Sequence, residues 1–447
     1  MSCLAATGVT NIRSRRAATG ARFIYTWGYQ DMPPRNCLFL LVDCLRSDLA
    51  LGEGRPVVTP NLDALVRGGA AFTQAVSVAG NTHVCLASLA TGVYPFLHGV
   101  RPISINRFNL SAGKMNPAWP TLAEVLKGRG YLTAASMTGP ALHTTGFSRG
   151  FDRYDYRETE DVYLRTGLAG RLVREIADLK VSGRPWFYFV HLWEIHAPRQ
   201  VAPEFASSRF GRTRYERALS SLDADLKHVL DAVALADTLV VVHGDHGAGR
   251  GGGALDILLH PRLHDRIGIH VSRVFYALFF KWIHSLRFLQ QSHGLNLYDY
   301  MVRVPLVLSG AGVPAGCKVP DLISQVDFFP TFLDLFGIPL EGLPPRNGRS
   351  LRPILEGGTL PERPVYMEAY SGRSVSRRFL PWRRVRSSAF EKPPPMVAVR
   401  TPEWKLIWVP EDPRIPAELY HLPDDPDERR NLAATRPEIV EGLKARL

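Results

Sequence analysis

Three short runs of apolar residues, each ending in polar groups, are the most distinctive pattern of the chain. They read N-C-L-F-L-L-V-D over residues 36–43, P-W-F-Y-F-V-H-L-W-E-I-H-A-P over 185–198, and T-L-V-V-V-H-G-D-H-G over 238–247. A continuous apolar run of this length is typical of a strand buried on both faces, as in a parallel sheet. Ligands of open α/β sheets collect at the carboxyl ends of strands. We therefore expect the polar residues that close these runs to belong to a functional site.

Helical patterns alternate with these runs. Thr59 and Pro60 open one helix, because a capping residue and a proline precede apolar positions at helical spacing. A second helix is expected over residues 121–130, and a strand over 131–136 follows it. This alternation predicts an α/β fold with a doubly wound sheet.

The C-terminal part of the chain has a different pattern. Proline and glycine cluster between Gly337 and Gly358, which indicates a linker or a domain edge. Beyond this cluster, strand-like stretches occur around residues 365–369, 397–400 and 405–409, and a terminal helix follows. We therefore expect a small C-terminal antiparallel α+β subdomain packed on the main domain.

Composition and charge restrict the classes of partner. The 447 residues are 45% hydrophobic and 21% charged, which is ordinary for a soluble globular protein. The formal net charge of +12 favours anionic partners: sulfated or phosphorylated substrates, anionic lipid surfaces or nucleic acid. No RNA- or DNA-binding motif accompanies this charge, so we expect no nucleic-acid partner. The alternative interpretation is that the excess of basic over acidic residues has no functional role.

The cysteines and the N-terminal segment indicate in which cellular compartment we expect the protein. Five scattered cysteines form neither a disulfide framework nor a metal-binding spacing, which favours a reducing compartment. Residues 1–35 carry arginines without an apolar stretch behind them, so they are not a secretory signal as written. We expect a disordered leader there, with a wrongly assigned start site or an organellar transit peptide as alternatives, and a cytoplasmic protein.

The segment from Asn81 to Pro95 reads N-T-H-V-C-L-A-S-L-A-T-G-V-Y-P. Its closing half, from Ser88 onward, resembles the nucleophile segment of the sulfatase branch of the alkaline-phosphatase superfamily. Counting back at the spacing of that family, the nucleophile position falls on Thr82. A threonine hydroxyl needs a metal or an adjacent base to attack, and a helix N-terminus adds backbone donors for an oxyanion. The alternative is that Thr82 only caps the helix.

The cysteine that sulfatases oxidise to formylglycine does not appear where the pattern requires it. Cys85 is out of register with the nucleophile position, and the residue four after it is Leu89 rather than arginine. Counted from Thr82, the expected proline and arginine are Val84 and Leu86. The maturation motif is therefore absent in either register. We interpret Cys85 as a small buried hydrophobic residue.

The resemblance also implies a metal site. Asp43 matches the first metal-binding aspartate of the family, and Asp245 with His246 matches its second pair of ligands. Cys44 stands where a second aspartate often follows, which removes one ligand. Burial of an acid at a strand end costs free energy unless the acid is paired or metal-bound. The alternative interpretation is that Asp43 only caps a helix. We predict that Asp43, Asp245, His246 and the Thr82 hydroxyl bind a divalent metal.

The ligand types narrow the choice of metal. Calcium prefers a shell of oxygen atoms only, whereas His246 contributes nitrogen. We therefore favour manganese or zinc, with calcium as the alternative.

Two residues after the second apolar run are further candidates. His196 matches the active-site histidine of relatives, which donates to the transferring group or protonates the leaving oxygen. Glu194 replaces the usual aspartate near it and is predicted to bind substrate. His191 lies within the same run, and we interpret it as a core residue.

An insertion over residues 250–292 interrupts the resemblance. Arg250 is a candidate to replace the lysine that holds the substrate anion in relatives, and His293, where the resemblance resumes, is a candidate for leaving-group assistance, substrate binding or a second metal. The insertion itself is interpreted as a helix packed on the main domain. The alternatives are a lid, a partner-docking helix or a peripheral membrane contact through residues 255–290.

Together these features predict an alkaline-phosphatase-like doubly wound mixed sheet flanked by helices. We expect a leader over residues 1–35, a sulfatase-like catalytic domain over 36–345 and a C-terminal subdomain over 346–447. The predicted function is metal-dependent hydrolysis or transfer of a sulfate or phosphate ester of a glycan, lipid or small molecule. Thr82 is the predicted nucleophile, and phosphoryl transfer is favoured because the formylglycine motif is absent. The alternatives are a catalytically silent protein that binds an anionic glycan or lipid, and a membrane-surface transferase.

Overall fold

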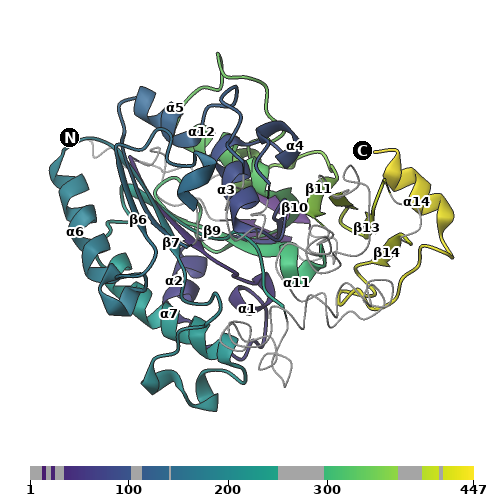
Figure 1. Ribbon diagram of the computed structural model, residues 1–447, viewed down its shortest axis with the longest axis horizontal. Coiled ribbons are helices and arrows are strands. Elements are labelled where there is room, and N and C mark those ends of the chain that lie inside the picture. Colours follow the sequence, from purple (N-terminus) through teal and green to yellow (C-terminus); the bar gives the residue numbers. More distant parts are fainter. Residues whose placement is uncertain are drawn as a thin grey trace, which may run out of the picture.

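A computed structural model describes residues 13–16, 22–25, 35–101, 113–139, 142–249, 296–370, 395–411 and 416–446. An eight-stranded sheet forms its centre, in the order β10-β4-β9-β8-β3-β7-β5-β6 (Figure 1). The strands are β3 (Asn36–Val42), β4 (Gly69–Val76), β5 (Leu132–Thr138), β6 (Arg153–Arg157), β7 (Trp186–Leu192), β8 (Thr238–Gly244), β9 (Arg303–Gly310) and β10 (Cys317–Ser324). β9 runs antiparallel to β4 and β8, while the other pairs are parallel, so the predicted mixed α/β sheet is confirmed.

The three apolar runs of the sequence are the neighbouring central strands β8, β3 and β7. Every residue of these strands is buried, as expected for strands covered on both faces. The parallel pairing sets Val42 opposite both Leu192 and Gly244, so the three strands end at the same level. The polar residues that follow them therefore meet at one edge of the sheet.

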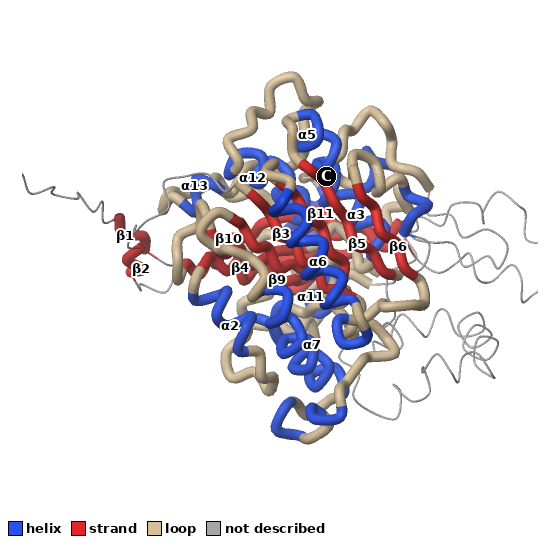
Figure 2. The backbone as a smooth tube through the Cα atoms, turned by 90° about the vertical axis from the view of Figure 1, so that its left-hand side faces the viewer, coloured by secondary structure: helices blue, strands red, loops and turns tan. Residues whose placement is uncertain are grey.

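Helices cover both faces of the sheet. On one face, α2 (Pro60–Arg67), α6 (Leu168–Val181) and α7 (Arg214–Leu230) pack against Leu38, Leu40 and Val42 of β3. On the other face, α3 (Thr82–Thr91), α5 (Leu122–Gly128) and α12 (Phe328–Leu335) pack against Phe39 and Leu41. Figure 2 shows α2 and α7 on one side of the strands and α5 and α12 on the other. None of the helices in the described part of the chain is long and apolar enough to cross a membrane.

Shorter elements complete the described chain. The short helices are α1 (Ser47–Ala50), α4 (Pro95–His98), α11 (Asp299–Val302) and α13 (Arg352–Leu355). Single 3-10 turns are η1 (Leu142–Thr145), η2 (Leu164–Thr166), η3 (Pro203–Phe205), η4 (Ser208–Phe210) and η7 (Gln325–Asp327). Within the segment expected to be a leader, β1 (Arg13–Arg16) and β2 (Arg22–Tyr25) pair as an antiparallel two-stranded sheet.

A second, four-stranded antiparallel sheet lies near the C-terminus, as predicted. Its order is β11 (Val365–Tyr370), β12 (Pro395–Arg400), β13 (Trp404–Trp408) and β14 (Glu418–His421), and α14 (Pro437–Lys444) packs on it (Figure 1). Lys405 of β13 is fully buried and places Nζ 2.9 Å from both Asp299 of α11 and Glu428. This ion cluster joins the small sheet to the helix that precedes β9.

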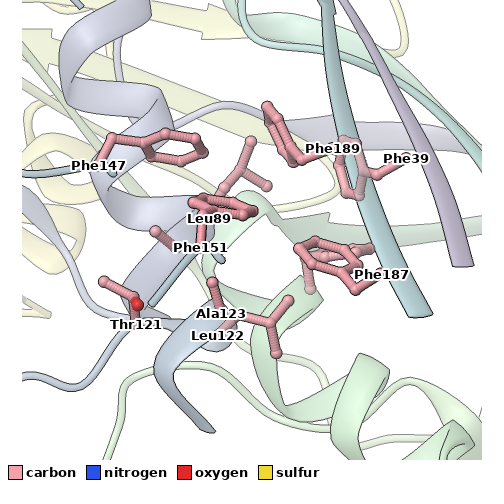
Figure 3. Close-up of a pocket in the computed structure, with 11 residues that line it drawn as sticks. Phe39, Leu89, Thr121, Leu122, Ala123, Phe147, Phe151, Phe187 and Phe189 are labelled. Carbon is pink, nitrogen blue, oxygen red and sulfur yellow. The ribbon is translucent and has the colours of Figure 1, made fainter. Parts of the chain in front are cut away.

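A small apolar cavity lies within the core of the main sheet (Figure 3). It measures about 20 Å³ and is lined mainly by phenylalanine rings, including Phe39 and Phe187. Its polar lining residue is Thr121, whose hydroxyl already accepts the Glu124 N–H and donates to the Arg149 carbonyl. A space of this size without partners for a water molecule is a packing gap rather than a binding site.

Candidate active site

Four side chains predicted to form one group meet at the carboxyl edge of the central sheet. Asp43 follows β3, Asp245 and His246 follow β8, and Thr82 is the first residue of α3. Asp43 and Asp245 expose 0% of their surface, His246 2% and Thr82 8%. Because β3 and β8 end at the same level, the two acids reach this point from neighbouring strands. The predicted convergence is observed.

Two glycines give the chain room on either side of the Asp-His pair that follows β8. A Cβ on Gly244 would lie 2.6 Å from the Leu45 carbonyl oxygen, and one on Gly247 would lie 2.1 Å from the Tyr300 carbonyl oxygen. Both approaches are closer than a side chain allows. Both glycines of the G-D-H-G sequence are therefore required on steric grounds, whereas the aspartate and histidine between them are explained by their chemistry.

The Thr82 hydroxyl lies between an acid and an imidazole. Its Oγ1 donates to Oδ2 of Asp43 at 3.2 Å and lies 3.2 Å from Nε2 of His246. Nδ1 of His246 lies 2.8 Å from the Gly247 carbonyl, which can only accept, so Nδ1 carries the proton. In the neutral ring Nε2 then holds a lone pair, which faces Thr82 and, at 3.3 Å, Oδ2 of Asp245. Lone pairs that face one another in a buried site need a proton or a cation between them.

The two carboxyl groups have pKa values shifted in opposite directions. Burial opposes ionisation of Asp43, but nearby histidines, His196 first, outweigh it and hold the pKa of Asp43 well below its usual range. Burial, and then the charge of Asp43, raise the pKa of Asp245. Such a split between adjacent buried acids is typical of carboxylates that share a proton or a cation.

His191 is fully buried, as its interpretation as a core residue requires, yet it also belongs to this cluster. Its Nε2 lies 3.3 Å from Oδ2 of Asp43, and its Nδ1 lies 2.6 Å from the Thr138 carbonyl. The pairing of β3 with β7 sets Leu41 opposite His191, and Asp43 follows two residues later on the same face. The signal that identifies His191 is therefore the register between two strands, which the sequence does not display.

His196 lies beside the cluster. Its ring stacks on Trp193 with 3.8 Å between ring centroids, and its Nδ1 lies 2.7 Å from the Ala197 carbonyl, so Nδ1 carries a proton. Burial lowers the pKa of His196, while the charge of Asp43 opposes this shift. The stacking on Trp193 and the bond to Ala197 hold the ring close enough to Asp43 for the charge of that acid to affect the pKa of His196.

Glu194 is oriented toward a different part of the chain. Its Oε1 accepts the backbone N–H of Leu164, the first residue of η2, at 2.7 Å. Burial raises the pKa of Glu194 to about 7. The side chain thus bonds to η2 rather than to Asp43, and its substrate-binding role stays a prediction.

The two cysteines near the site are placed differently. Cys85 is fully buried beside Val84 and Tyr94, and its thiol donates to the Ala79 carbonyl at 3.1 Å, which confirms it as a buried residue. Cys44 is also buried, and burial, followed by the charge of Asp43, raises the pKa of its thiol.

From the sequence alone, Cys44 only removes a ligand. In the structure its Sγ and one ligand atom each of Asp43 and His246 all lie within 4.8 Å of one another.

The donor atoms fit a divalent cation. Oδ1 of Asp43 accepts no hydrogen bond from any described residue, although the carboxylate is wholly buried. Neighbouring donor atoms lie 3.2, 3.2 and 3.3 Å apart, close enough for one cation to contact several of them. Asp43, Asp245, His246 and Thr82 would hold such an ion. Arg250 and His293, the other predicted site residues, lie outside the described residues together with the insertion.

The sulfatase family profile matches residues 35–338 of this chain. The chain belongs to the sulfatase family. Arylsulfatase K of Homo sapiens is 31% identical to it over 159 residues, which are 35% of this chain and 27% of that protein. The chain thus spans about a quarter of the length of the curated relatives it matches. Sulfatase-family enzymes are generally metal-dependent, in agreement with the donor set described above.

Solved structures share the fold of this sulfatase-family protein over nearly its whole length. The phosphonate monoester hydrolase of Agrobacterium radiobacter superposes with a TM-score of 0.65 at 19% identity, covering 92% of this chain and 94% of that one. A protein in complex with its substrate D-glucosamine-2-N,6-O-disulfate superposes with a TM-score of 0.65 at 16% identity, covering 93% of this chain and 96% of that one. These similarities establish the alkaline-phosphatase-like fold.

Proposed function

We propose that this sulfatase-family protein is a metal-dependent hydrolase or transferase of phosphate or sulfate esters in which Thr82 is the nucleophile. The observation that carries the proposal is the position of Thr82 Oγ1, 3.2 Å from both Oδ2 of Asp43 and Nε2 of His246 at the start of α3. A hydroxyl that only capped its helix would turn toward the helix backbone, but the Thr82 side chain turns toward an acid and an imidazole.

A divalent ion held by Asp43, Asp245, His246 and Thr82 would neutralise the substrate anion and lower the pKa of the Thr82 hydroxyl. The ligands include an imidazole nitrogen, which favours manganese or zinc, with calcium as the alternative. The chain itself supplies a second source of positive potential. A helix N-terminus carries a partial positive charge, so the start of α3 would favour a substrate oxyanion beside Oγ1.

The side chains then have separate roles in the reaction. The Thr82 hydroxyl loses its proton to solvent, and Oγ1 forms a bond to phosphorus or sulfur as the bond to the leaving oxygen breaks. His196, once its Nε2 has taken up a proton from solvent, gives that proton to the leaving oxygen, while Nδ1 stays bonded to the Ala197 carbonyl. His293 remains a candidate for the same role. Water then cleaves the ester on Thr82 and restores the hydroxyl.

The comparisons support an anionic ester as the substrate. One structural neighbour is a phosphonate monoester hydrolase, and another was solved in complex with its substrate, D-glucosamine-2-N,6-O-disulfate. Because Cys85 is buried in the core and no formylglycine motif is present, phosphoryl transfer is favoured over sulfuryl transfer. The class proposed is a phosphate or sulfate ester of a glycan, lipid or small molecule.

One experiment tests the proposal against a catalytically silent protein that binds an anionic glycan or lipid. Aryl phosphate, phosphodiester, phosphonate and aryl sulfate esters are assayed with added manganese, zinc or calcium, using wild type, Thr82→Ala and Thr82→Ser. We expect wild-type turnover, a loss of about a thousandfold or more in Thr82→Ala, and partial activity in Thr82→Ser. A Thr82→Ala protein as active as wild type would exclude Thr82 as the nucleophile. The absence of turnover with every ester and metal would favour the silent binder.

A further inference from the structure

Cys44 has an unusual backbone conformation at the metal site. It follows Asp43 directly, with φ at +64°, a region that non-glycine residues seldom occupy. Two hydrogen bonds hold it there: its N–H donates to Oδ1 of Asp245 at 3.0 Å, and its carbonyl accepts the Tyr215 hydroxyl at 2.6 Å. A strained backbone position that is fixed from both sides is a reason to look for a function of the side chain.

The side chain of Cys44 lies among buried donors. Its Sγ and single ligand atoms of Asp43 and His246 lie mutually within 4.8 Å, and all three residues are buried. A separate observation also indicates a ligand at this point: Oδ1 of Asp43, on a carboxylate with 0% exposure, has no hydrogen-bond donor in the described part of the chain. Sulfur, nitrogen and carboxylate oxygen therefore converge at one buried point.

We propose that Cys44 supplies a thiolate ligand to the metal centre and makes the centre select a soft cation such as zinc over calcium. The inference rests on the proposed function, since it concerns the same metal. As the sulfur–metal bond forms, the S–H bond breaks and its proton passes to solvent. Calcium takes six to eight oxygen ligands, whereas zinc binds sulfur at about 2.3 Å and nitrogen or oxygen at about 2.0–2.2 Å. A set of sulfur, nitrogen and carboxylate oxygen therefore suits zinc.

Cobalt(II) is the probe, because it occupies zinc sites and a thiolate ligand gives it a charge-transfer absorption in the near ultraviolet. Metal-free full-length protein is titrated with cobalt. We expect wild type to bind the metal with this band, and Cys44→Ser to lose the band while it keeps the weaker visible bands of bound cobalt. Cys85→Ser is the matched control and should retain the charge-transfer band, because Cys85 bonds to the Ala79 carbonyl instead.

Affinity measurements give a second readout. Cys44→Asp exchanges sulfur for oxygen, and aspartate tolerates a positive φ. We expect the ratio of zinc to calcium affinity to fall by about tenfold or more in this variant. X-ray absorption of zinc-loaded wild type should show sulfur in the first shell, a result that does not depend on the folding of any variant.

The outcomes separate this inference from the proposed function. If wild type binds cobalt or zinc but shows neither the charge-transfer band nor zinc–sulfur scattering, Cys44 is not a ligand and the metal centre stands. A charge-transfer band that persists in Cys44→Ser would also show that Cys44 is not a ligand. If wild type binds manganese or calcium but neither cobalt nor zinc, only the inference about Cys44 is overturned. If it binds none of these metals, the proposed metal-dependent function itself is overturned.

Discussion

Nε2 of His191 lies 3.3 Å from Oδ2 of Asp43, across the paired strands β7 and β3. The other ring nitrogen, Nδ1, lies 2.6 Å from the Thr138 carbonyl, an acceptor, so it must donate. Burial opposes protonation of the ring, but the hydrogen bond and charge of Asp43 outweigh it and raise the pKa of His191. His191 thus lies against a predicted metal ligand, and we predict that it positions that carboxylate.

We expect His191→Gln to weaken metal binding by about 10- to 100-fold, because partners of ligands typically contribute this much to affinity. Metal titration of the purified variant measures the effect. The matched control is His98→Gln: His98 is equally buried, but its Nε2 bonds to Ser88 rather than to an acid of the site. Equal metal affinity of both variants and wild type would show that His191 has no positioning role.

Removal of the metal should abolish activity and lower thermal stability. Asp43 and Asp245 are buried together, and without a cation their charges repel each other. We expect a chelator to reduce turnover of the best ester substrate to background, and manganese or zinc to restore it. The melting temperature should rise with metal concentration, because the ion binds the folded state. Full activity in protein shown by elemental analysis to be metal-free would contradict this.

Glu194 should make stability depend on pH. Its folded pKa of about 7 lies above the ordinary value of 4.5, so the folded protein binds the extra proton between these two pH values. Wild type therefore loses stability as pH rises through this window, by an amount on the order of 3 kcal/mol at 1.36 kcal/mol for each pKa unit. Glu194→Gln removes the titration, so its stability relative to wild type should increase from pH 5 to pH 8.

Denaturant unfolding at both pH values measures this difference, and the exposed Glu438→Gln serves as control. A stability difference between Glu194→Gln and wild type that is the same at the two pH values would refute the shifted pKa.

Cys85 should remain an unmodified thiol. It is fully buried and donates to the Ala79 carbonyl, and the sequence around it lacks the formylglycine motif. Peptide mass spectrometry should find cysteine at this position, and Cys85→Ala should keep turnover within about twofold of wild type. Detection of formylglycine at residue 85, together with loss of activity in the alanine variant, would shift the nucleophile from Thr82 to Cys85.

The buried ion cluster at Lys405 should stabilise the fold without affecting the site. Lys405→Met leaves Glu428 buried without its cation, while Asp299 keeps its pair with Arg400, and loss of one partner from a buried pair typically costs about 3–5 kcal/mol. Thermal unfolding measures the loss, and metal affinity should not change. Lys444→Met is the control, because its pair with Glu441 is largely exposed and is expected to contribute at most about 1 kcal/mol. Similar unfolding temperatures for both variants would show that the buried cluster adds nothing.

Local pattern was sufficient for the main elements of this protein. The three apolar runs became β3, β7 and β8, since a strand buried on both faces must be apolar at every position. The sequence also predicted that α2 begins at Thr-Pro and that α3 begins at Thr82, because helix starts depend on a few neighbouring residues. The ends of two such strands were enough to indicate Asp43, Asp245 and His246.

Contacts across the sheet were decided by tertiary structure alone. The register of β3 against β7 brings His191 to Asp43, and the turn after β3 brings Cys44 back toward His246. Glu194, whose substrate-binding role stays a prediction, accepts the backbone N–H of Leu164 in η2. Each of these contacts joins segments 30 or more positions apart in the chain, and their alignment depends on how whole strands and helices pack. Neighbouring residues determine whether a segment is a strand or a helix, but only packing determines which side chains meet.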